Sequence, residues 1–262
     1  MTIVRHVLRQ GRRRFWIWTA VIAALLATCV FLFPEMKGEM EDLGGMFAQM
    51  GSFTAAFGMD KLNFGTLIGY YAIECANVLG LGGAFYAALT AIGALSKEEK
   101  DKTAEFLLTH PVSRARVVTE KLIALLLQIT ALNVIVYAVS VGSIFAIGEE
   151  VPWKELNLMH LAFWLLQLEI AGICFGISAF SRSGGVGAGI GIAMLLYFMN
   201  LIANITDKAA FLKHVTPYGY CDGADIVANG TLDCGMIAVG MAAAVVFVLI
   251  AYLKYTRKDI HS

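Results

Sequence analysis

Six long apolar stretches constrain the possible folds of this sequence more than any other feature. Each is long enough to cross a hydrocarbon core about 30 Å thick as an α-helix, which takes about 20 residues. With 58% hydrophobic and 15% charged residues, a chain of 262 residues is too apolar for an ordinary soluble domain. The sequence therefore predicts an all-α membrane protein with six transmembrane helices, over residues 15–33, 66–95, 119–147, 157–180, 186–206 and 235–254.

Basic side chains are distributed unevenly between the two ends of these spans. If the N-terminus is cytoplasmic, 15 of the 20 lysines and arginines fall in cytoplasmic segments, and five, Lys37, Lys61, Lys154, Lys208 and Lys213, fall outside. Short loops rich in Lys and Arg stay in the cytoplasm. We therefore expect a multi-pass inner (plasma) membrane protein with both termini in the cytoplasm. The first apolar run is too long for a signal peptide and five more follow, so we expect it to be retained.

Residues 1–14 have the pattern of an interfacial amphipathic helix. Val4 and Val7 lie on one helical face, whereas Arg5 and Arg9 lie on another. Such a helix lies in the headgroup region with its basic side toward anionic lipid. A short solvated basic tail that only sets the topology is the alternative interpretation. Residues 15–262 then form the six-span domain.

A short cytoplasmic helix is predicted between the second and third spans, over about residues 97–110. Ser96 and Glu99 form an S-x-x-E capping box at its start. His110 precedes Pro111, which biases it out of the α region and ends the helix. Ser113 can then cap the helix that becomes span three.

This predicted helix has an apolar face that includes Leu107 and Leu108. Such a face, on a helix held between two membrane spans, could form a binding surface for a soluble partner. It could equally pack only on the membrane helices of its own chain. The residues alone leave both interpretations open.

The stretch KTAEFLLTHPVSRARVVTEKL, preceded by two adjacent glutamates, resembles the segment between spans two and three in permeases of ABC-2 type exporters. The segments IWTAVIAALL, VTPYGYCDGADIVANGTLD and YTRKDI resemble further parts of that family in the same order. The resemblance implies a coupling helix seated in a groove of a cytoplasmic ABC ATPase subunit. The residues that it assigns to ATPase coupling are Glu98, Glu99, Glu105, Leu107, Leu108, Pro111 and Arg114.

The resemblance implies the permease subunit of an exporter, which forms the translocation path with a second copy or a sister permease. No G-x-x-x-x-G-K-[ST] motif occurs, so ATP hydrolysis is expected on a separate subunit, with no catalytic residue and no cofactor in this chain. A net charge of zero argues against a nucleic-acid partner. A membrane enzyme, a membrane-anchored assembly or maturation factor, and a secondary transporter are the alternatives. The sequence does not identify the substrate.

Two carboxylates lie inside predicted spans, where ionisable residues are costly to insert and therefore functional candidates. Glu169 lies near the middle of span four, and Glu74 lies in the outer third of span two. Glu169 could contact a substrate or could hold helices together through Gln128 or Asn133 on span three. We favour the structural role, because a single carboxylate makes a poor proton relay.

The remaining features concern packing and the external segments. The glycine-rich run over residues 184–191 reads as a helix-packing surface rather than a phosphate loop. The external segments are about 34–65, with an amphipathic helical pattern near residues 40–50, and about 207–234, where the family places short helices.

Of the five cysteines, Cys221 and Cys234 share an external segment, so a disulfide between them is a hypothesis. No cysteine or histidine spacing indicates a metal site.

Overall fold

The computed structural model describes residues 2–47, 51–59, 61–101, 112–181 and 185–257. These residues form helices joined by turns, with no strand in the described ranges. The long helices are α1 (Thr2–Phe47), α7 (Arg114–Ala146), α8 (Trp153–Ser178), α9 (Val186–Ile205) and α11 (Cys234–Arg257). The shorter ones are α2 (Ser52–Ala56), α3 (Leu67–Cys75), η1 (Ala76–Leu81), α4 (Gly82–Ala91), α5 (Lys97–Lys100), η2 (Asp207–His214), η3 (Pro217–Cys221) and α10 (Gly223–Asn229).

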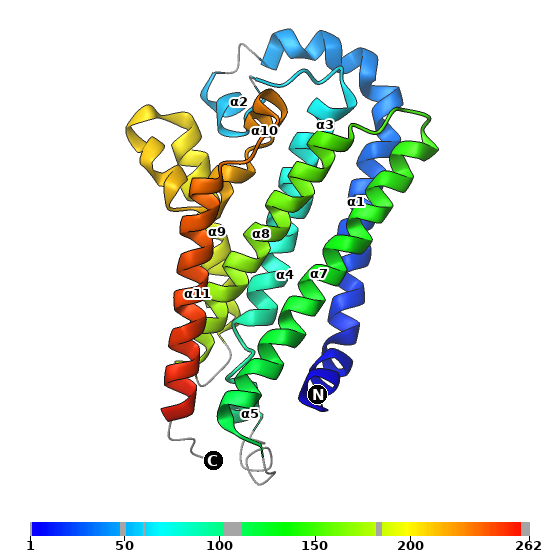
Figure 1. Cartoon of the computed structure of the whole chain (residues 1–262). Coiled ribbons are helices and arrows are strands. Elements are labelled where there is room, and N and C mark those ends of the chain that lie inside the picture. The colour runs from blue at the N-terminus through cyan, green and yellow to red at the C-terminus, as the bar shows by residue number, and fades with distance from the viewer. Residues whose placement is uncertain (1, 48–50, 60, 102–111, 182–184, 258–262) are drawn as a thin grey trace.

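Six segments of the described chain are long and apolar enough to cross a membrane, which confirms the predicted number. One of them is composite, since α3, η1 and α4 together build the second span. α1 packs along α7, whereas α8 packs against both α4 and α11. Figure 1 shows that the start of α1, α5 and the C-terminal end of α11 lie at one end of the bundle, and that α2 and α10 lie at the other. We call the first of these the terminal end.

The second span is irregular near its middle. Residues 76–81 form a π-helix, a rare conformation that widens one turn of a helix. Gly80 lies inside this turn, and a Cβ there would lie 2.7 Å from Phe163 Cε1 on α8. A Cβ at Gly83 would overlap the Gln167 side chain. These glycines therefore allow the second span to approach α8 closely.

α1 runs as one continuous helix from Thr2 to Phe47, so it carries the predicted interfacial segment directly into the first span. The interfacial position of residues 1–14 stays a prediction. No helix-breaking residue separates the basic start from the apolar run. At 1.5 Å per residue its 46 residues span about 70 Å, which exceeds a hydrocarbon core of about 30 Å. Pro34 lies inside this helix, and the C-terminal part of α1 turns across the end of the bundle (Figure 1). The amphipathic pattern near residues 40–50 is helical as far as Phe47, and Met50 lies outside the described residues.

The second external segment folds back onto the bundle as η2, η3 and α10. Tyr218, Tyr220 and Cys221 are buried against the spans. A Cβ at Gly223 would lie 2.9 Å from Ala72 Cβ of α3, so this segment packs closely on the second span. The short helices expected from the resemblance are therefore present; η3 and the start of α10 are buried against the spans, whereas no residue of η2 is buried.

Candidate functional site

The candidate site is the start of α7 at the terminal end, where four parts of the chain meet. Ser113 has extended backbone angles (φ −67°, ψ 146°), and its Oγ accepts a hydrogen bond from the backbone N of Arg116 at 3.3 Å. This geometry satisfies one of the backbone donors that lack a partner in the first turn of a helix. The predicted cap of span three is confirmed.

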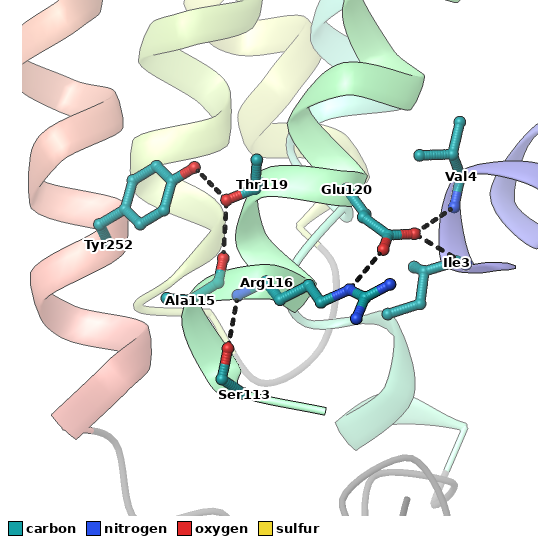
Figure 2. A network of polar contacts seen from close by, with 8 residues as sticks. All are labelled: Ile3, Val4, Ser113, Ala115, Arg116, Thr119, Glu120 and Tyr252. Carbon is teal, nitrogen blue, oxygen red and sulfur yellow. Dashed lines mark hydrogen bonds and ion pairs between the residues drawn. The ribbon is translucent and has the colours of Figure 1, made fainter. Parts of the chain in front are cut away.

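Glu120, one turn further along α7, holds the beginning of α1. Its Oε2 accepts hydrogen bonds from the backbone N of Ile3 at 3.0 Å and of Val4 at 3.2 Å, and its Oε1 accepts one from Arg116 Nε at 2.8 Å (Figure 2). The first N–H groups of a helix lack intrahelical partners and carry partial positive charge. A carboxylate from a different helix therefore caps α1.

Lys121 is the next residue on α7, and it holds α5. Its side chain is only 3% exposed. Nζ donates a hydrogen bond to Ala94 O at 2.6 Å and forms an ion pair with the Glu98 carboxylate. Two adjacent residues of α7 thus bind two separate elements, the first turn of α1 and the connection from α4 to α5.

Glu98, which the resemblance assigned to ATPase coupling, forms an ion pair with Lys121 of its own chain, and the coupling role stays a prediction. Its carboxylate is directed toward α7 and its side chain is 22% exposed. In this structure Glu98 positions α5 within its own chain. The neighbouring Glu99 is half-buried and has interactions of its own.

The predicted capping box at the start of α5 does not form. Ser96 has a helical backbone conformation (φ −100°, ψ −4°) and makes no side-chain capping bond. An N-cap residue needs extended angles to direct its oxygen toward the next turn, whereas Ser96 follows a turn that continues from α4. Its buried Oγ has no hydrogen-bond partner in the structure.

The last turns of α11 also contact the start of α7. Thr119 Oγ1 and the Tyr252 hydroxyl lie 2.8 Å apart (Figure 2). Arg114, predicted to couple to the ATPase, directs Nη1 to Thr256 O at 3.4 Å. The other predicted coupling residues, Glu105, Leu107, Leu108 and Pro111, lie outside the described residues.

Glu169 is buried, and its partner differs from those predicted. The Tyr220 hydroxyl of η3 donates a hydrogen bond to Glu169 Oε1 at 2.8 Å. The polar groups suggested from the sequence pair elsewhere, since Gln128 Oε1 accepts from Tyr86 and Asn133 bonds to Gln167 at 2.7 Å. Sequence spacing identified residues on facing helices but could not reveal that η3 folds back to α8.

Glu169 also borders α11, because a Cβ at Gly240 would overlap its carboxylate. The second intramembrane carboxylate, Glu74, lies within 3.5 Å of Cys29 Sγ of α1. Both contacts join helices of the same chain. In the described part of the chain, no group of three or more histidine, cysteine, aspartate or glutamate side chains could hold a metal ion.

A polar cluster that the sequence did not predict joins three spans near the opposite end. The Tyr71 hydroxyl donates to Ser140 Oγ at 2.9 Å and lies 2.8 Å from His160 Nε2. The Tyr137 ring packs edge-on against the imidazole, with centroids 5.1 Å apart. His160 is the single histidine of the predicted spans, and a lone histidine gave no signal of this kind.

The hypothesised disulfide between the external cysteines is absent. Cys221 is buried and Cys234 is exposed, and both are free thiols. Burial, with Glu169 nearby as a lesser cause, raises the pKa of the Cys221 thiol well above its ordinary value. Cys221 is therefore a packing residue with low reactivity.

The six spans define a multi-pass membrane protein, and polar contacts at the terminal end tie the start of its second connection, α5, to the third span. The sequence matches the family described as ABC-2 family transporter protein over residues 1–260. The chain therefore belongs to the ABC-2 transporter membrane family. It is also 26% identical over 215 residues to the uncharacterized protein YhcI of Bacillus subtilis (strain 168), an alignment that covers 72% of this chain and 68% of that protein.

Proposed function

We propose that this chain is the permease subunit of an ABC exporter and couples to a separate ATPase subunit at its terminal end. The observation that supports this proposal best is the pair of adjacent residues on α7. Glu120 holds the start of α1, and Lys121 holds α5. A force applied to the loop after α5 would thus reach the second, third and first spans together.

The connected elements suggest how such a force acts. α5 follows the second span directly, and α7 is the third span. If ATP-driven closure of the partner displaces the predicted 97–110 helix, Lys121 carries the displacement into α7 and Glu120 carries it into α1. The bundle then shifts between two arrangements, as expected for a transporter that alternates its open side. A second copy or a sister permease would complete the translocation path.

The test is a charge placed on the predicted coupling face. Leu108→Glu should abolish co-purification of the ATPase and transport, because a charge buried in a partner's groove without a counter-ion costs several kcal/mol. Phe211→Glu is the matched control, since Phe211 is a 65% exposed apolar residue of η2, far from the terminal end. The isolated Leu108→Glu permease should keep normal thermal stability. Normal recruitment of the ATPase by this variant would refute the proposal.

The proposed orientation has its own test. We place the terminal end in the cytoplasm, because 15 of the 20 basic residues belong to segments on that side. In intact cells, an impermeant thiol reagent should label a single cysteine at position 40 and spare one at position 101. Labelling at 101 but not at 40 would reverse the topology.

A further inference from the structure

A cavity of about 410 Å³ lies at the terminal end, bounded by α1, α4, α5 and α7. It lies just where the basic start of α1 passes into its apolar run, because Arg14 and Trp18 both line it. A second cavity of about 330 Å³ shares Arg14 and Trp18 and extends along α1 to Ile17. The Lys121–Glu98 ion pair and the Gln128 side chain, described above, border the larger cavity.

The floor of the larger cavity presents hydrogen-bond donors. Lys121 lines it, and an ammonium has three donors, of which Ala94 O and Glu98 take two. Gln128 also lines it; among the described hydrogen bonds its Oε1 alone is used, by Tyr86. A Cβ at Gly11 would lie 3.0 Å from Gln128 Nε2, so a glycine on α1 leaves this amide room.

The rim of the cavity is basic. Arg14, Lys97 and Lys100 line it, and none of the three forms an ion pair with another described residue. The carboxylates at the cavity are Glu98, which is bound to Lys121, and Asp101. Donors on the floor, and rim cations that pair with no carboxylate of the described residues, favour an anion with several acceptor oxygens, as a phosphate has.

The mouth of the cavity has an apolar side. Val186 of α9 lines it and is 55% exposed, and Ile17 of the adjoining cavity is 53% exposed. Exposed apolar side chains on membrane spans face acyl chains. A free phosphate would gain nothing from this wall, whereas a lipid would bury its chains along it.

We propose that this cavity binds the phosphate headgroup of an anionic phospholipid from the leaflet at the terminal end. The lipid phosphate contacts Arg14, Lys97 and Lys100, and its acyl chains leave between α1 and α9. Because α1, α5 and α7 all line the cavity, the bound lipid ties together the elements that Glu120 and Lys121 join. This site does not depend on the chain having an ATPase partner.

The experiment is native mass spectrometry of the purified full chain with phosphatidylglycerol added to delipidated protein. The test variant is Arg14→Gln/Lys97→Gln/Lys100→Gln. The control is Arg5→Gln/Arg9→Gln/Arg12→Gln, which removes the same charge from exposed positions of α1 outside both cavities. We expect the test variant to lower phosphatidylglycerol occupancy at least about tenfold and the control to lower it less than about threefold.

Two competitors distinguish the sources of the phosphate. Diacylglycerol, which lacks the phosphate, and glycerol phosphate, which lacks the chains, should each fail to displace bound phosphatidylglycerol at equal concentration. Full displacement by glycerol phosphate would mean that the cavity takes a free phosphate, and the lipid proposal would be wrong. Equal losses in the test and control variants would mean diffuse attraction by the basic helix, which would also overturn it.

Discussion

The ion pair between Lys121 and Glu98 makes a quantitative prediction, because its two members are buried to different degrees. The Lys121 side chain is 3% exposed and the Glu98 side chain 22% exposed. In Glu98→Gln the ammonium stays buried and loses its counter-ion, because the glutamine and Ala94 O offer it only neutral oxygen acceptors. Breaking a buried pair in this way costs about 3 kcal/mol of unfolding free energy or more.

Replacing Lys121 should lower the unfolding free energy less than replacing Glu98 does. In Lys121→Met the carboxylate of Glu98 remains, but it reaches water, and methionine keeps most of the apolar stem. The expected loss is about 1.5 kcal/mol, the value of one charge-assisted hydrogen bond. The double variant Glu98→Gln/Lys121→Met removes both charges, so we expect its unfolding free energy to lie within about 1 kcal/mol of that of the native chain.

The assay is an unfolding titration of the purified chain in mild detergent with a denaturing detergent, followed by tryptophan fluorescence. Glu98→Gln should be the least stable of the three variants, and the double variant should be more stable than it by about 2 kcal/mol. If the two single effects simply add in the double variant, the residues do not interact. Equal effects of the single changes would refute the argument from unequal burial.

Three further predictions follow from packing, thiol burial and capping. Gly240→Val should lower the unfolding free energy by about 1–3 kcal/mol, because its side chain would overlap the carboxylate on α8; a normal unfolding midpoint would show that α11 does not pack there. A maleimide should label Cys234 in the folded chain and leave Cys221 unmodified until denaturant is added, because burial hides that thiol and raises its pKa. Ser113→Ala should destabilise the chain by about 1 kcal/mol whereas Ser96→Ala should not, since only the former serine caps a helix; equal shifts of the midpoint would contradict the two backbone geometries.

The sequence predicts those features of this fold that depend on neighbouring residues. Each span is encoded by one continuous apolar run, and the cap at Ser113 depends only on the turn that follows it. The helix predicted at the N-terminus is present, but it continues past residue 14 into the first span, which the sequence pattern did not reveal. A change from basic to apolar residues alters the surroundings of a helix without breaking its hydrogen bonds.

The contacts that build the candidate site are long-range and leave no local pattern. Glu120 and Val4 are 116 residues apart, and Tyr220 and Glu169 are 51 residues apart. Glu120 lies among helix-forming residues near the end of a predicted span, where a glutamate is common and gives no sign of a capping role. Its capping role exists only because α1 and α7 pack side by side.

The cap on α1 has a consequence for the order in which the protein is built. Ribosomes synthesise α1 before α7, but the carboxylate that accepts the first N–H groups of α1 belongs to the third span. While the first two spans enter the membrane, the N-terminal turn of α1 therefore has no Glu120 to bind. Only insertion of α7 supplies it, so the first turn of α1 acquires this anchor after a further 116 residues have been made.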